Sequence, residues 1–347
     1  MTDIIVGAPF HLVEESAVDV LGAVKSFTIA AHDPPWSSIS SRVPSPERLV
    51  SAWDMELSRL EEMASKGVPG SVIVGFGGGT ALDTAKFLSW KSGKTLIQIP
   101  TITSVDAGFT DAIGVRVDGK VRYIAKLAPQ RVVLDLAIVG AAPKRLNRAG
   151  VGDVLSCHTG LWDWQLAVKH GEGHPWRDDL ANLGRQLLDR LFAAAVHFGE
   201  VDDEAIRLLA RSYQRIGAAC AEARHSRFEE GSEHFWAYAY EHLTGAHPVH
   251  GEIIAFATVL MSFLQGNEPE RVRDFVNSCH VQASPADLGI ERAHFDQTFA
   301  SLKQYVRREN LDFSIIDVLD WDDNLIDAAW EFVQGIHPIS SVEPIAK

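Results

Sequence analysis

The sequence predicts an α/β protein with two domains: an N-terminal domain built on a parallel sheet and a C-terminal domain that is all helical. Its 347 residues exceed what one ordinary hydrophobic core accommodates. Short β-rich runs alternate with helical segments up to about residue 143, which is typical of a parallel sheet covered by helices. Strands become scarce after that point. We therefore expect domains at residues 1–147 and 148–347.

The N-terminal domain contains four short apolar runs with the composition of buried strands, at 26–31, 71–79, 95–101 and 131–136. The stretch 46–67 has an amphipathic helical pattern that ends at a glycine, so we expect one helix there. In residues 114–126, Asp118-Gly119 separates two alternating runs, and this pattern predicts a β-hairpin. The second domain has long helical patterns at 178–197, 203–225, 232–243 and 250–265.

Composition limits the classes of function. The formal net charge of −14, without a cluster of Lys or Arg, argues against a nucleic-acid-binding surface. Three widely spaced cysteines without a CxxC pair fit a reducing cytoplasm. The N-terminal "MTDIIVGAPFHLVEE" has early acids and no charged-then-apolar leader, and no window of eighteen residues is apolar and uncharged. We expect a cytoplasmic protein that acts on a small molecule, without a signal peptide or membrane span.

Four glycines mark the end of the strand at 71–79 and the start of the next helix: Gly75, Gly77, Gly78 and Gly79. Consecutive glycines let backbone N–H groups approach a phosphate closely, and a helix N-terminus adds a favourable dipole. The spacing is neither GxGxxG nor a P-loop, since no GK[ST] follows. Taken by themselves, the glycines are explained equally well by a tight strand-to-helix turn that binds no ligand. Their position after a buried strand of an α/β domain favours phosphate or pyrophosphate binding.

Asp33 follows the strand at 26–31. A carboxylate at the end of an early strand can accept hydrogen bonds from a ribose diol, and it would disfavour a 2′-phosphate. This hypothesis favours NAD over NADP. An ordinary turn aspartate before Pro34-Pro35 explains the same residue at least as well.

Two histidines and one aspartate form a candidate metal site. His234 and His250 are sixteen positions apart (250 − 234), in two successive helical patterns, and Asp153 stands where a further helix begins. Two imidazoles and one carboxylate suit a divalent cation that keeps coordination positions open for substrate or water, such as catalytic Zn²⁺ or Fe²⁺. Taken singly, each histidine is better explained as a polar surface or hydrogen-bonded core residue, and the aspartate as a helix N-terminal acid.

Five segments occur in a characteristic order: "GFGGGTALDTAK", "IPTITSVDAG", "VVLDLAIVGAAPKRLNRAGVGD", "SRFEEGSEH" and "HPVHGE". In this order the chain resembles the dehydroquinate synthase-like and iron-containing alcohol dehydrogenase superfamily over about residues 25–265. Within the superfamily it most resembles the sn-glycerol-1-phosphate dehydrogenases, and glycerol dehydrogenase comes next. The resemblance implies an N-terminal nucleotide-binding domain, a helical C-terminal domain, and a homo-oligomer.

The resemblance also implies roles for individual residues. It implies a metal held by Asp153, His234 and His250, with zinc as the first choice and iron or nickel as alternatives. Asp106 would face the substrate. The pyrophosphate of NAD or NADP would lie along the following residues, of which the two threonines lie nearby: Gly77, Gly78, Gly79, Asp83, Thr101 and Thr103.

The activity implied is transfer of hydride between NAD(P)H and a small polyol or polyol phosphate, in the first place dihydroxyacetone phosphate and sn-glycerol 1-phosphate. Glycerol dehydrogenase or another iron-type alcohol dehydrogenase is the alternative. A sugar-phosphate cyclase of the dehydroquinate synthase type fits less well, because its usual "GGKTG" loop is missing after Asp106. A proton relay is also required, and Asp106, His247 or a ribose hydroxyl are the candidates.

This chain differs from the glycerol-1-phosphate branch at two places, and both differences argue against a phosphorylated substrate. Phe228, Glu229 and Glu230 stand where the glycerol-1-phosphate branch usually has small neutral residues, and acids facing the site would repel a phosphate. The helix after Asp153 lacks a lysine that is often expected there. Arg227 is the first candidate to hold a substrate phosphate, with a structural salt bridge to a neighbouring glutamate as the alternative.

Overall fold

The computed structural model describes residues 10–339, so part of the segment behind the signal-peptide expectation lies outside the described residues. The chain divides into two compact units. One runs up to Ala142 and includes Ile206–Arg224, and the other contains Pro143–Ala205 and the chain from His225. The division lies close to the predicted boundary at 147/148, but the segment from Ile206 was predicted to belong to the second domain.

Helix α11 (Asp203–Ala223) explains why this segment clusters with the first unit. Its Tyr213 is buried and donates a hydrogen bond to the carbonyl of Thr103 over 3.0 Å. A Cβ on Gly217 would meet the carbonyl oxygen of Phe109 at 2.0 Å, so the helix approaches that segment more closely than any side chain permits. These contacts join residues about a hundred positions apart, which a local pattern does not reveal.

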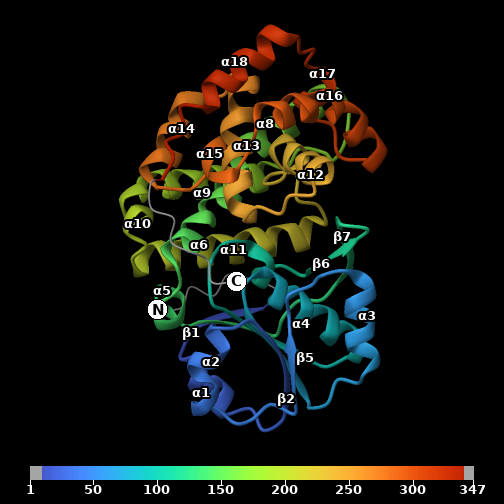
Figure 1. Ribbon diagram of the computed structural model, residues 1–347, viewed down its shortest axis with the longest axis vertical. Helices are drawn as coiled ribbons and strands as arrows, with labels where there is room; N and C mark the ends of the chain where they lie inside the picture. Colours follow the sequence, from blue (N-terminus) through green and yellow to red (C-terminus); the bar gives the residue numbers. More distant parts are fainter. Residues whose placement is uncertain (1–9, 340–347) are drawn as a thin grey trace. The chain divides into compact units, whose positions relative to one another are not determined.

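The first unit contains a six-stranded sheet in which all pairs are parallel, in the order β1-β8-β5-β4-β2-β3 (Figure 1). This confirms the predicted α/β class. The strands are β1 (His11–Glu14), β2 (Phe27–Ala31), β3 (Arg48–Ser51), β4 (Val72–Gly77), β5 (Thr95–Pro100) and β8 (Arg131–Leu134).

Helices cover both faces of this sheet. Helices α1 (Ala17–Gly22) and α2 (Pro35–Ile39) pack on one face, and α3 (Leu57–Ser65) and α4 (Gly79–Ser92) pack on the other. Successive side chains of a strand point to opposite faces, so neighbouring residues of β4 join different hydrophobic clusters. The sheet is thereby buried on both sides, and its polar chemistry is left to the ends of its strands.

The single helix expected at 46–67 is wrong. Residues Arg48–Ser51 form strand β3, and the helix begins only at Leu57. Val50 is buried against the sheet, and pairing with β2 overrides the helical pattern of the surrounding residues. Strand β1 was not anticipated.

The predicted hairpin is confirmed. Strands β6 (Ala112–Val117) and β7 (Lys120–Lys126) are antiparallel. Both turn residues between them, Asp118 and Gly119, have positive φ angles, as a two-residue hairpin turn requires. Three short elements complete this unit: η1 (Ser40–Arg42), η2 (Asp106–Phe109) and α5 (Leu136–Gly140).

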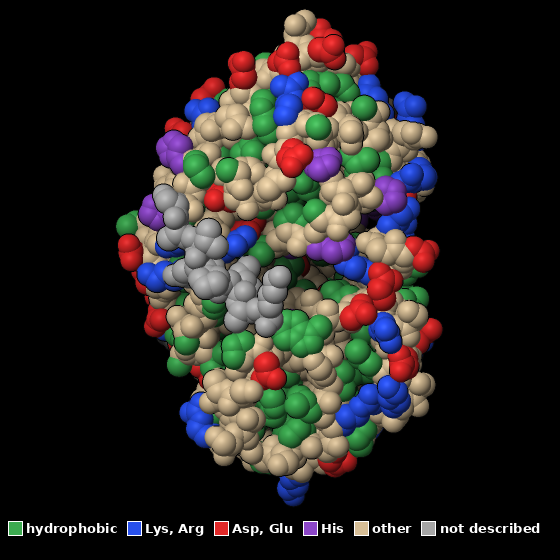
Figure 2. Space-filling model, in the orientation of Figure 1, with side chains coloured by type: hydrophobic (Ala, Val, Ile, Leu, Met, Phe, Trp, Pro, Cys, Tyr) green, Lys and Arg blue, Asp and Glu red, His purple; other side chains and the backbone are tan. Residues whose placement is uncertain are grey.

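Among the described residues of the second unit, every regular element is a helix, as predicted (Figure 1). No helix in residues 10–339 combines the length and apolarity needed to cross a membrane. Acidic and basic side chains are interspersed over the face drawn in Figure 2. The helices are α6 (Lys144–Ala149), α7 (Val151–Leu155), α8 (Cys157–Lys169), α9 (Asp178–Ala193), α10 (Ala195–Glu200), α12 (Ser232–Thr244), α13 (His250–Gln265), α14 (Pro269–Ser278), α15 (Pro285–Leu288), α16 (Arg292–Glu309), α17 (Ile315–Val318) and α18 (Asp323–Val333).

Candidate metal centre and glycine turn

Helices α7 and α13 cross at two glycines. A Cβ on Gly152 would lie 2.0 Å from the carbonyl oxygen of Gly251, so only glycine permits this approach. Asp153 follows the first glycine, and His250 precedes the second. The close crossing therefore places an aspartate and a histidine from distant parts of the sequence beside each other. Their Oδ1 and Nε2 atoms are 3.4 Å apart.

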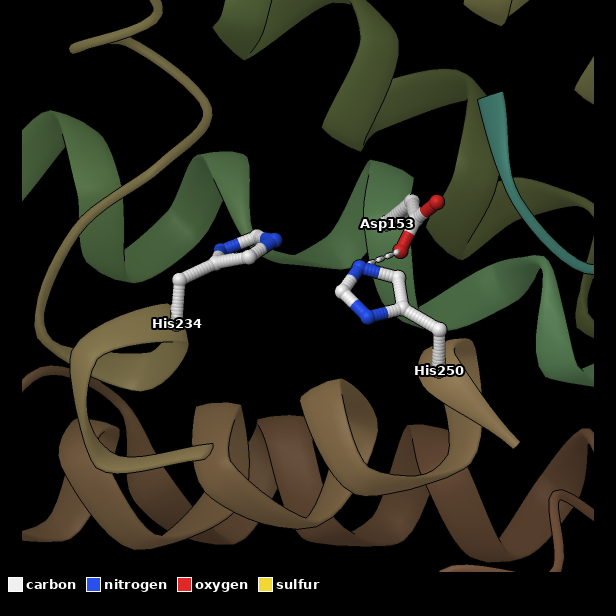
Figure 3. Close-up of side chains that lie close together, drawn as sticks. All are labelled: Asp153, His234 and His250. Carbon is white, nitrogen blue, oxygen red and sulfur yellow. Dashed lines mark ion pairs between the residues drawn. The ribbon is translucent and has the colours of Figure 1, made fainter. Parts of the chain in front are cut away.

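Asp153, His234 and His250 each offer one ligand atom, and these atoms all lie within 4.8 Å of one another (Figure 3). The two imidazole centroids are 5.5 Å apart. Tetrahedral zinc with bonds of about 2.0–2.2 Å separates its ligand atoms by roughly 3.3–3.6 Å. The 3.4 Å between Asp153 and His250 already matches this separation, and the donor set of two nitrogens and one carboxylate oxygen suits Zn²⁺ or Fe²⁺. The residues fit a divalent cation.

Glu233 orients the His234 imidazole. Its Oε1 atom lies 2.8 Å from Nδ1 of His234 and accepts a hydrogen bond from the N–H of Gly231. Its Oε2 atom accepts a hydrogen bond from the hydroxyl of Thr159 over 2.7 Å. The carboxylate is fully buried, and Nε2 of His234 is left as the metal-facing nitrogen.

Electrostatics favour a cation at His234. Burial opposes a charge on the imidazole, but the hydrogen bond that the imidazole donates to Glu233 and the charges of Glu230, Glu233 and Asp153 outweigh it and raise the pKa of His234 to about 10. The carboxylates thus stabilise positive charge at this point. A divalent cation would take the place of the proton, because a histidine must be neutral to bind a metal.

Replacing Glu233 with glutamine is expected to weaken metal binding by about 10- to 100-fold, because the amide is a weaker acceptor for the Nδ1 proton and carries no charge. Competition with a metal chelator measures the affinity. A Glu241→Gln variant serves as control, since that carboxylate lies on the same helix outside the ligand cluster. Equal affinities of wild type and Glu233→Gln would contradict the orienting role.

A buried ion pair supports the start of helix α13, and sequence analysis missed it. Glu252 is fully buried and receives two hydrogen bonds from Arg145 of α6, at 2.6 and 2.7 Å. Such bidentate pairs fix geometry as well as charge. The pair therefore holds the turn that carries His250. The two residues are 107 positions apart, so no local pattern marks them as partners.

The loop before α12 brings a further carboxylate to the centre. Glu230 accepts hydrogen bonds from Ser226 (2.7 Å) and from Tyr238 (2.9 Å). Burial opposes its charge, but His234 and then the two hydrogen bonds and His250 lower the pKa of Glu230. One of the two acids predicted to matter for a phosphorylated substrate is therefore an electrostatic partner of both histidines.

Arg227 is fully buried and holds the same loop. Its guanidinium donates hydrogen bonds to the carbonyl oxygens of Phe313 (2.8 Å) and Glu230 (3.3 Å), and it lies 4.0 Å from a carboxylate oxygen of Asp312. These contacts favour a structural role over the predicted phosphate contact. His247 is more than half exposed, and its Nδ1 lies 3.8 Å from Glu241, outside the ligand cluster.

In the first unit, the glycine turn lies at the carboxyl end of β4. Gly77 has a φ of +154°, and Cβ atoms on Gly78 or Gly79 would meet Ile102 or Val105 at less than 3 Å. Gly78 precedes helix α4 and gives it no side-chain cap. These glycines are therefore required by close packing against side chains of the same unit. The turn also lies at the N-terminus of α4, a position that suits a phosphate.

The remaining candidates of this unit are placed as follows. Thr101 and Thr103 are buried, and the N–H of Thr101 bonds to the carbonyl of Gly77, while Asp106 is half-buried and begins η2. Asp83 is buried with Lys86 at 3.0 Å, which favours a structural role. Asp33 is exposed and accepts two hydrogen bonds from Ser37, as the turn hypothesis expects.

A parallel α/β unit with a glycine turn and a helical unit with an Asp-His-His cluster together define a class of nucleotide- and metal-dependent proteins. The family model of iron-containing alcohol dehydrogenases matches residues 42–143. The chain belongs to this family, because it is at least 30% identical to two relatives over more than two thirds of its length. This confirms the resemblance seen in the motifs.

The relatives include two NAD(P)+ glycerol-1-phosphate dehydrogenases. The chain is 32% identical to that of Pyrobaculum neutrophilum over 249 residues, which cover 70% of this chain and 72% of the relative. It is 30% identical to that of Sulfurisphaera tokodaii over 235 residues, with coverage of 68% and 67%. The crystal structure of a probable glycerol dehydrogenase from Sinorhizobium meliloti has the same fold, with a TM-score of 0.75, 22% identity and coverage of 95% and 98%.

Proposed function

We propose that this protein is an NAD(P)-dependent, metal-containing dehydrogenase that interconverts a small polyol or polyol phosphate with its ketone. Its first candidate reaction is the reduction of dihydroxyacetone phosphate to sn-glycerol 1-phosphate. The convergence of Asp153, His234 and His250 on one point carries this proposal. The glycine turn and the glycerol-1-phosphate dehydrogenase relatives support it. Homo-oligomeric assembly in the cytoplasm is part of the same proposal.

The three ligands would hold zinc, with iron or nickel as alternatives. A divalent cation bound there would act as a Lewis acid on the hydroxyl or carbonyl oxygen of the substrate. Glu233 fixes the orientation of one imidazole, and Arg145 with Glu252 fixes the helix start that carries the other. The chain thereby presents its donors in a preset arrangement, which reduces the reorganisation that binding requires.

The nicotinamide would carry the hydride, and the protein would bind and orient it. Gly77, Gly78 and Gly79 are the proposed pyrophosphate contacts, because they lie at the N-terminus of α4, where backbone N–H groups and the helix dipole favour a phosphate. Asp106 and His247 remain the proposed proton-relay residues. Asp33 remains the proposed ribose contact, through the carboxylate that Ser37 already orients.

A second candidate substrate is unphosphorylated dihydroxyacetone, so that the protein would be a glycerol dehydrogenase. One observation favours it: the Glu230 carboxylate interacts electrostatically with both ligand histidines, and its charge would repel a nearby phosphate. The metal's two positive charges oppose this effect. The two substrates must therefore be compared directly.

Zinc-loaded protein is expected to oxidise NADH when dihydroxyacetone phosphate is added, and to lose this activity after treatment with a chelator. The rate of NADH absorbance loss is measured with the phosphorylated and unphosphorylated ketone side by side. Higher kcat/KM for the phosphate supports the first reaction, and the reverse supports glycerol dehydrogenase. Metal-loaded protein that binds NADH but turns over neither ketone would exclude both substrates.

A further inference from the structure

Three strands end at the same level on the carboxyl edge of the sheet. Ala31 of β2 pairs with Phe76 of β4 on one side and with Ser51 of β3 on the other. The residues two positions further on are Asp33, Gly78 and Trp53. Crossing the edge from β4 through β2 to β3, one therefore meets the glycine turn, then His32 and Asp33, then a tryptophan.

The His32 imidazole connects these three strand ends. Its Nε2 lies 2.7 Å from the carbonyl oxygen of Ala52, and its Nδ1 accepts a hydrogen bond from the N–H of Gly78 over 3.4 Å. This network assigns the proton to Nε2 of a neutral ring. Burial lowers the pKa of His32, which agrees with the neutral form. The ring thus ties the end of β3 to the glycine turn of β4.

Trp53 stacks on this imidazole, with ring centroids 4.7 Å apart and an interplanar angle of 24°. One face of the indole is thereby supported, while the side chain is 59% exposed. The supported plane presents a surface on which another planar ring can stack.

We propose that Trp53 is the platform on which the adenine ring of NAD(P) stacks. The inference rests on the proposed dinucleotide-dependent function. In a dinucleotide, one ribose separates the adenine from the pyrophosphate. Adjacent strands lie about 4.8 Å apart, so the ends of β4 and β3 are separated by about 10 Å, with β2 between them. The glycine turn, Asp33 and Trp53 therefore follow the order pyrophosphate, ribose and base.

The chemistry of the platform fits a purine ring, and adenine is the purine that NAD(P) supplies. Stacking on an aromatic ring does not require charge, and every purine offers a π-face. The Trp53 side chain lies in the same unit as the glycine turn and is joined to it through His32, so both ends of the adenosine diphosphate moiety would be bound by one rigid edge. The nicotinamide half is not needed for this contact, so AMP alone should bind to it.

The test compares AMP and NADH binding by isothermal titration calorimetry, using the zinc-loaded full-length protein and its variants. Trp53→Ala is expected to bind both ligands roughly tenfold more weakly, because base–aromatic stacking contributes at about this level. Trp53→Phe retains an aromatic plane and should stay within about threefold of wild type. Trp90→Ala is the matched control, since Trp90 is 39% exposed at the other end of helix α4.

Kinetics provide a second readout. Trp53→Ala should raise the KM for NADH and leave kcat at saturating NADH unchanged, because the reacting ring is not touched. If wild type binds NADH and AMP but Trp53→Ala binds them equally well, the platform is refuted and the proposed function stands. If wild type binds neither ligand, the proposed function and the platform both fall.

Discussion

Replacing His234 with alanine is expected to remove the bound metal and to lower kcat/KM by at least about a thousandfold. A metal acting as a Lewis acid contributes several kcal/mol of transition-state stabilisation, and about 4 kcal/mol corresponds to a thousandfold in rate. Among residues 10–339, His234 supplies one of the three side-chain ligands of the cluster, and it is the one whose orientation Glu233 fixes. Its loss leaves two donors, which hold zinc poorly.

Metal content is measured by elemental analysis after gel filtration, and activity is measured in the same preparations. His242→Ala is the matched control, because His242 lies on the same helix, is exposed, and contacts the ring of Tyr305 rather than the cluster. That variant should keep its metal. A His234→Ala protein that retains one equivalent of metal and near wild-type activity would place the centre elsewhere.

Replacing Gly152 with alanine is expected to have the second largest effect. The new methyl group would lie 2.0 Å from the carbonyl oxygen of Gly251 and 3.0 Å from the backbone nitrogen of Ala255. Backbone atoms cannot rotate away, so helices α7 and α13 must separate. Overpacking of this kind costs about 1–3 kcal/mol, and we expect the upper end here. The separation would also draw Asp153 away from His250 and weaken metal binding.

Thermal unfolding with and without added zinc measures both effects. The control is Gly22→Ala, because a Cβ at that position meets nothing within 4 Å. We expect Gly152→Ala to lower the melting temperature of the metal-free protein and to reduce the further rise that zinc produces. A variant with unchanged melting temperatures and full metal content would show that the crossing tolerates a side chain.

Much of the candidate site was predictable, because the types of its residues and their positions in the expected helices indicate which ligand they can bind. Two histidines in successive helices and an aspartate at a helix start indicated a metal, and the structure brings their ligand atoms within 4.8 Å. Arg227 shows the opposite case. Its residue type suits a phosphate, but the buried guanidinium bonds to the carbonyl oxygens of Phe313 and Glu230. The carbonyl of Phe313, 86 positions away, does not leave a recognisable pattern in the sequence.

The sequence by itself determined the local features: the apolar strands, the glycine turn after β4, the Asp118-Gly119 hairpin and the helices that carry both histidines. Each depends on residues within a few positions of one another, where periodicity and backbone preference act. Only the tertiary structure decided that residues 48–51 form an edge strand, that α11 belongs with the first unit, and that Arg145 supports His250 through Glu252. These outcomes depend on pairing, close helix crossing and burial between distant segments. Such contacts stabilise the native state only when the distant segments have come together, so a local sequence pattern does not reveal them.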